Sequence, residues 1–221
     1  MKNLESNFIS IANKEVHNPT FPFTLQFLSV HEIQFESNLP KVKDLIVSGD
    51  NKTASVYYCV KDEEFFFHVL ININAQSDMY IKWVNVAPYH SCIFRAISDI
   101  LTIDKIVSRL NILKPTEIWA NNCDPTKQNT KYRNDGFEIE LDQSALPFED
   151  KLLALLEYLE QDKESLNSLV EDCTLYIKVL STFYNEPLPG GYFLDSLIIE
   201  KLNSLNIKID FVLYISGRSI E

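Results

Sequence analysis

Apolar and polar residues alternate through much of the first 90 residues, as they do in strands with one buried face. The earliest alternation covers residues 23–28 and predicts a strand. Three later segments are rich in β-branched and aromatic residues and are separated by polar turns: residues 55–61, 65–73 and 79–86. Together these three segments predict an antiparallel β-meander.

Two segments of this region show no clear periodicity of apolar residues. Residues 1–20 are mixed in character, and we expect little order there. Residues 39–47 fit either a short helix or another strand.

After Pro88 the pattern changes to strands that alternate with helices. Helical spacing of apolar residues predicts helices over 103–110, over 152–170 with a break near Gln161, and after a cap at Asp195. In the last helix, Leu197, Ile198, Leu202 and Leu205 are expected to face inward. Strands are expected at residues 92–97, 137–141, 174–182 and 209–215. The sequence therefore predicts an α+β protein with a β-rich lobe over 1–90 and a β-α-β-α-β-α-β lobe over 91–221.

Composition and charge limit the range of partners. The chain has 221 residues, 46% of them hydrophobic, which is ample for a packed core. Its net charge is −11 and no run of Lys and Arg is present, so nucleic acid and anionic membranes are disfavoured as partners. A basic protein is a compatible partner, although acidity also serves solubility alone.

The N-terminal residues and the cysteines favour a cytoplasmic location for the protein. Neither a signal peptide nor a membrane-spanning run is visible. The four cysteines contain no CxxC pair, which argues against zinc, and a reducing compartment suits them: Cys59, Cys92, Cys123 and Cys173. Cys123 is the one expected to be exposed, and the other three are expected to be buried.

Five segments of the second lobe follow one another in a specific order. They are the strand 92–95, the helix 103–110, the segment Leu113-Lys114-Pro115-Thr116-Glu117-Ile118-Trp119, the leucine-rich helix 151–160 and the final helix and strand 199–214. In this order they resemble an uncharacterised bacterial family catalogued as domain of unknown function 4279, over about residues 91–217. After the tryptophan the family often has Lys-Gly-Asp, where this chain has Asn122-Cys123-Asp124. The resemblance implies a shared fold and brings no known reaction, cofactor or catalytic residue.

No motif of an established catalytic or metal site occurs in the sequence. HExxH, the Walker loop, GxSxG and GxGxxG are all missing. His68 lies within a strand, either exposed or as a satisfied core residue. The carboxylate pairs Glu138/Glu140 and Glu157/Glu160 are more typical of solvated faces than of acid–base chemistry. We therefore predict no catalytic residue, no metal and no cofactor.

Two regions are candidates for binding a protein partner. The polar loop 120–136 contains residue types that are common in binding hot spots, and the leucine-rich helix has an acidic opposite face. The candidate contact residues are Trp119, Asn122, Asp124, Tyr132 and Arg133 of the loop region and Glu157, Glu160, Asp162 and Glu164 of the helical face. These features favour a non-catalytic protein-binding protein, and specifically an immunity protein that neutralises a basic bacterial toxin.

Two other functions remain open at this point. One is an enzyme or small-ligand sensor of unfamiliar type, with a pocket between the two lobes or under the 120–136 loop. The other is a scaffold that self-associates through the meander, where Phe65, Phe66 and Phe67 would supply aromatic surface.

Overall fold

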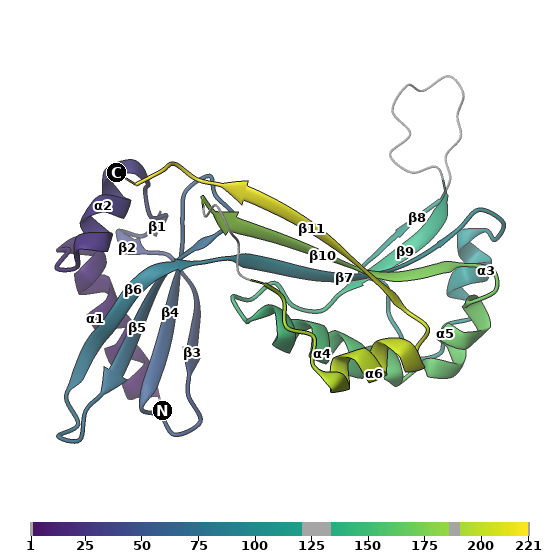
Figure 1. Cartoon of the computed structure of the whole chain (residues 1–221), viewed down its shortest axis with the longest axis horizontal. Helices are drawn as coiled ribbons and strands as arrows, with labels where there is room; N and C mark the ends of the chain where they lie inside the picture. Colours follow the sequence, from purple (N-terminus) through teal and green to yellow (C-terminus); the bar gives the residue numbers. More distant parts are fainter. Residues whose placement is uncertain (1, 121–133, 186–190, 221) are drawn as a thin grey trace.

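The computed structural model describes residues 2–120, 134–185 and 191–220, which form two lobes (Figure 1). The first lobe has a four-stranded antiparallel sheet in the order β3-β4-β5-β6 and a small β1-β2 hairpin. Its elements are α1 (Lys2–His17), α2 (Pro22–Val30), β1 (Phe35–Glu36), β2 (Leu39–Pro40), β3 (Val42–Val47), β4 (Thr53–Cys59), β5 (Phe66–Ile73) and β6 (Met79–Ala87). The predicted meander is confirmed, and the ambiguous residues 39–47 form strands.

The second lobe has a five-stranded sheet in the order β11-β10-β7-β9-β8. Its elements are β7 (Tyr89–Ser98), α3 (Ile103–Val107), β8 (Glu117–Trp119), β9 (Asp135–Glu140), α4 (Phe148–Glu160), α5 (Lys163–Leu169), β10 (Thr174–Tyr184), α6 (Ser196–Ser204) and β11 (Lys208–Ser216). Only β10 and β11 run parallel; the other pairs are antiparallel. The α+β class is confirmed. Strand β8 was not expected, so the order is β-α-β-β-α-α-β-α-β.

Side-chain alternation explains why one face of this sheet is packed against helices. In β7, Cys92, Phe94 and Ala96 point to the same side and are buried. In α4, Leu152, Leu155, Leu156 and Leu159 form the facing stripe, which has the spacing of an amphipathic helix. The helices α4 and α6 lie along the lower side of the sheet in Figure 1. None of the described helices is both long enough and apolar enough to cross a lipid bilayer.

Two predictions for the N-terminal segment were wrong. Residues 2–17 form a helix rather than a poorly ordered lead-in, because Phe8, Ala12 and Val16 recur every four residues and are buried. Residues 22–30 form a helix rather than a strand. Pro22 suits the first helical turn, and Phe27 is buried while Leu25 is 56% exposed. The alternation of apolar residues that suggested a strand was therefore misleading.

Other expectations about exposure also need correction. Leu197 is 46% exposed instead of facing inward, whereas Ile198, Leu202 and Leu205 are buried as predicted. The run Phe65 to Phe67 is buried and offers no surface for self-association. Cys92 and Cys173 are buried as expected, and Cys59 is partly buried.

The far ends of β10 and β11 connect the two lobes. Tyr184 at the end of β10 packs into the hydrophobic core of the first lobe. Thr182 donates a hydrogen bond to Glu64 (3.1 Å), and Ser216 donates one to Glu63 (2.8 Å). The chain after β11 therefore lies against the first lobe, where the backbone carbonyl of Arg218 accepts a hydrogen bond from the Tyr184 hydroxyl (2.6 Å).

Asp162, expected on the exposed acidic face, is instead buried at the junction of α4 and α5. Its Oδ2 accepts hydrogen bonds from the backbone N–H groups of Asn111 (2.9 Å), Ile112 (2.8 Å) and Leu113 (3.2 Å), and Oδ1 accepts one from the Ser165 hydroxyl. Burial alone would raise the pKa of Asp162. The hydrogen bonds outweigh burial and lower its pKa from 3.8 to about 2. Asp162 therefore fixes the segment after α3 to the helical layer.

Replacing Gly217 by alanine should destabilise the contact between the lobes. Gly217 has φ +93°, and an added Cβ would lie 2.6 Å from a Tyr184 ring carbon and 3.0 Å from a Phe65 ring carbon. We expect Gly217→Ala to lower the free energy of unfolding by about 2 kcal/mol in urea titration, from backbone strain and overpacking. Gly49→Ala is the control, because no atom lies within 4 Å of its added Cβ. Equal losses in the two variants would contradict this account.

Removing the Asp162 carboxylate should destabilise the protein in a pH-dependent way. Asp162→Ala leaves three backbone N–H groups without their acceptor, so we expect a loss of about 3 kcal/mol at pH 7. The folded-state pKa is depressed, so the stabilisation is complete above the unfolded value and disappears as the pH falls.

The wild-type advantage should therefore shrink between pH 3.8 and about 2, measured as the difference in unfolding free energy across that range. Glu164→Ala, at an exposed site two residues away, is the matched control and should change stability by less than about 0.5 kcal/mol. A difference that persists at its pH 7 value down to pH 2 would refute the role of the charge.

Candidate functional site

A cavity of about 390 Å³ opens at the end of the second sheet that lies away from the first lobe. It is lined by the end of β7, the turn before β10 and the start of β11, which topology brings together. Its apolar lining includes Ile97 and Leu175, and its polar lining includes Asp99, Glu171 and Lys208. The mixed lining makes this cavity a candidate for binding.

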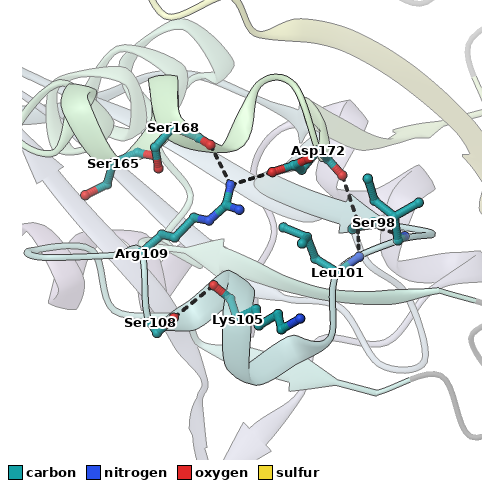
Figure 2. A network of polar contacts seen from close by, with 9 residues as sticks. Ser98, Leu101, Lys105, Ser108, Arg109, Ser165, Ser168 and Asp172 are labelled. Carbon is teal, nitrogen blue, oxygen red and sulfur yellow. Dashed lines mark hydrogen bonds and ion pairs between the residues drawn. The ribbon is translucent and has the colours of Figure 1, made fainter.

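A polar network beside the cavity holds its walls in place (Figure 2). Arg109 donates 2.7 Å hydrogen bonds to the Ser168 carbonyl and to the Asp172 carboxylate. Ser98 donates to the Asp172 carbonyl (2.7 Å) and accepts from the backbone N–H of Leu101 (2.9 Å). Each of these groups joins two chain segments, so the network serves to connect α5, β7 and the segment around α3.

A second polar cluster lies between β7, β10 and α4. The side chains of His90 and Ser181 form a cross-strand hydrogen bond of 2.6 Å between Nδ1 and Oγ. Lys151 of α4, 3% exposed, donates to the backbone carbonyls of His90 (2.7 Å) and Ser144 (2.6 Å). Burial, and then the Lys151 charge, lower the pKa of His90 to about 4, so the imidazole is neutral at pH 7.

The buried nucleophile candidates are poorly placed for covalent chemistry. Ser181 is fully buried beside His90, which leaves a substrate carbonyl no approach to Oγ. Burial raises the pKa of Cys92 to about 12 and also raises the pKa of Cys173, which disfavours thiolates. No group of His, Cys, Asp or Glu suited to a metal ion occurs in the part of the chain that the structure describes. The cluster is therefore suited to joining β7, β10 and α4.

A smaller hollow of about 240 Å³ lies between the two lobes. Gln34, Cys59 and Glu64 line it from the first lobe, and Tyr89 and Gln143 line it from the second. An interlobe pocket was one of the two positions expected for a small ligand.

The predicted contact residues are brought together only in part. Glu157 and Glu164 are exposed on the helical layer, and Glu160 pairs with Lys201 of α6 at 2.5 Å. Trp119 is 8% exposed and packs under Arg95, whose guanidinium lies 6.0 Å from the indole centroid. Four other candidates, Asn122, Asp124, Tyr132 and Arg133, lie outside the described residues, as do Cys123 and most of the 120–136 loop.

The strand pair Glu138 and Glu140 shares a face, as the spacing predicted, but each carboxylate has a separate partner. Glu138 forms a salt bridge with Arg95 (2.8 Å), and Glu140 accepts a hydrogen bond from Ser91 (2.5 Å). An ion pair therefore occupies the Glu138 carboxylate, and a hydrogen bond occupies that of Glu140.

Three exposed apolar residues of the helical layer were not predicted from the sequence. Phe193 is 71% exposed, Leu197 46% and Ile199 54%, on α6 and just before it. Lys201 faces α4 through Glu160, and Leu197, one turn earlier on α6, lies on the same side. Residues 197–199 are all apolar, which is more than one buried stripe of a helix requires. This excess is the sequence signal that could have indicated an exposed apolar surface. Glu157 of α4, Glu164 of α5, and Phe193, Leu197 and Ile199 on or just before α6 are all exposed in the helical layer, and we call this set of residues the helical contact face.

Comparisons with known proteins agree with the resemblance seen in the sequence. Residues 87–216 match the family described as Domain of unknown function (DUF4279), which covers more than half of the chain. The matched region begins at the end of β6 and ends with β11, so it contains the whole five-stranded sheet and its helices. No curated protein and no solved structure matches the chain. On the family match, this chain belongs to the DUF4279 family.

Proposed function

We propose that this chain is a non-catalytic binding protein that captures a basic protein, in the way that an immunity protein captures its cognate toxin. The observation that carries the proposal is the helical contact face, where the helical layer has both exposed carboxylates, on α4 and α5, and exposed apolar side chains, on or just before α6. Protein interfaces combine apolar anchors with charged residues around them.

Electrostatics supports a basic partner for this face. The chain has a net charge of −11, which attracts cationic surfaces over long range. Glu157 and Glu164 are exposed and form no salt bridge with a described residue, whereas Glu160 is paired with Lys201. The two unpaired carboxylates are therefore available for a cationic partner.

The apolar residues of the face would supply the anchoring contacts. Phe193, Leu197 and Ile199 are each about half exposed or more, and large side chains of this kind contribute much of the binding energy when a partner covers them. Together the apolar anchors and the carboxylates favour a protein partner over a small polar ligand.

The first test is copurification with the products of the neighbouring genes. We expect a stoichiometric complex with a basic neighbour that inhibits growth when it is expressed without this chain. Coexpression should restore growth. If the chain neither binds the product of a neighbouring gene nor protects cells from it, the immunity proposal is contradicted.

Charge reversal on the face should slow association with that partner. Glu157→Lys combined with Glu164→Lys should lower the association rate about tenfold at low salt, and less at high salt, in surface plasmon resonance. The control is Glu36→Lys with Glu117→Lys, which changes the net charge equally at exposed positions on β1 and β8. A similar loss in both double variants would mean that net charge, and not this face, steers binding.

The hollow between the lobes supports a second candidate, a small-ligand sensor. Polar groups from both lobes line it, so a ligand there would contact both and stabilise their arrangement. A metabolite screen should then raise the melting temperature, and Gln143→Ala should abolish the shift without lowering the melting temperature of the free protein. Retention of the full shift by Gln143→Ala would place the ligand elsewhere.

A further inference from the structure

The edges of the two large sheets differ in how well they are protected from pairing with another strand. An edge strand presents unpaired backbone N–H and C=O groups, and natural proteins protect it with bulges, lysines or a very short strand. In the first lobe, the registers of β3 and β6 are irregular, with Lys43 and Lys82 at the irregular positions. In the second lobe, β8 has only three residues. Three of the four edges that the described strands form are therefore protected.

Strand β11 is the fourth edge, and it has none of these protecting features. It pairs with β10 on one side, over nine consecutive residue pairs without a shift in register. No described strand lies on its other side (Figure 1). Its charged residues, Lys208 and Asp210, are near its start, and residues 211–215 are all uncharged residues that favour strands. A segment of this kind at an open edge pairs readily with another strand.

The final part of β11 is exposed on both faces of the sheet. Leu213 is 47% exposed, Tyr214 52% and Ile215 57%. Alternation directs Leu213 and Ile215 to the same side as Phe211, which packs against the core of the second lobe, and directs Tyr214 to the opposite side. Because the side chains of a strand alternate in the same way, a neighbouring strand could cover the apolar residues on both faces.

The sequence of β11 is complementary to itself when two copies run antiparallel. With Val212 opposite its own copy, the facing pairs are Phe211 with Leu213, Asp210 with Tyr214, Ile209 with Ile215 and Lys208 with Ser216. Every aliphatic side chain and the phenylalanine thus face another apolar side chain, and no charge faces a like charge. Cross-strand pairs of this kind stabilise a sheet. The strand therefore fits a second copy of itself.

The negative charge of the chain opposes self-association only at long range. Each copy has a net charge of −11, but exposed charges are largely screened beyond about 8 Å at physiological ionic strength. At the strand itself, Lys208 and Asp210 cancel. Burial of apolar side chains does not depend on charge. Pairing through β11 should therefore become stronger as salt is added.

We propose that the chain forms a symmetric dimer in which β11 of one copy pairs antiparallel with β11 of the other, with Val212 at the centre. A two-fold interface needs one self-complementary surface, which β11 supplies. The five-stranded sheets of the two copies then form one continuous sheet of ten strands. The two-fold axis is perpendicular to this sheet, so α4 and α6 of both copies cover the same face.

Analytical ultracentrifugation of the full-length protein is the first test. We expect the mean mass to rise from 25.5 kDa toward the dimer value across the micromolar range, and further at high salt than at low salt. Capture of a basic protein has the opposite salt dependence, so the two proposals fail separately. A chain that stays monomeric across this range, or that dimerises less at high salt, contradicts the dimer.

A lysine at the edge should prevent the pairing. Ile215→Lys should weaken dimerisation at least about tenfold, because it places two charges in an apolar interface. Ile118→Lys is the matched control, since Ile118 is 58% exposed on β8 at the opposite edge of the same sheet. At concentrations where the wild type is monomeric, both variants should melt within a few degrees of it, because both side chains are more than half exposed. Equal dimerisation by the two variants would exclude β11 as the interface.

Oxidative cross-linking tests the register. In the proposed dimer, Val212→Cys places two thiols opposite each other, whereas the thiols of Lys208→Cys lie at opposite ends of the paired strands, about 27 Å apart. We expect a disulfide-linked dimer with Val212→Cys and not with Lys208→Cys, with the wild type as the control for the native cysteines. The pairing about Val212 is wrong if Val212→Cys cross-links no more than Lys208→Cys.

Discussion

The pairing of β7 with β10 is the interaction on which the rest of the structure depends. These two central strands align from Thr174 opposite Ile97 to Thr182 opposite Tyr89. Because side chains alternate along both strands, this register sets which ones face the helices and which face outward. The same register brings Ser181 to His90, places the cavity at one end of the sheet, and directs the other end toward the first lobe.

Most of the buried polar chemistry serves to hold this arrangement together. Asp162, Arg109 and Lys151 each join segments that are distant in the sequence, and each has backbone groups among its partners. Buried backbone N–H and C=O groups need partners, and a charged side chain satisfies several of them at once. The side chains that remain available to a partner therefore lie at the surface.

The exposed surfaces of the two lobes differ in chemistry. The helical contact face, within the family region, combines carboxylates with apolar anchors and suits a basic protein. The outer face of the first sheet has two exposed aromatic rings, Tyr80 and Trp83, and the exposed Lys82 lies between them in β6.

The sequence by itself determined the fold class, the meander, most helices and strands of the second lobe and its family, because periodic apolar residues report which side of an element is buried. It misassigned residues 22–30, where alternation and helical spacing both fit Phe23 and Phe27. Among the predicted contact residues, the sequence correctly indicated that Glu157 and Glu164 are exposed. It did not indicate that Asp162 is buried. Only the tertiary structure decided that, since the partners of Asp162 lie some fifty residues away along the chain. The contact between the side chains of His68 and Asn85 likewise depends on cross-strand register, which no local pattern encodes.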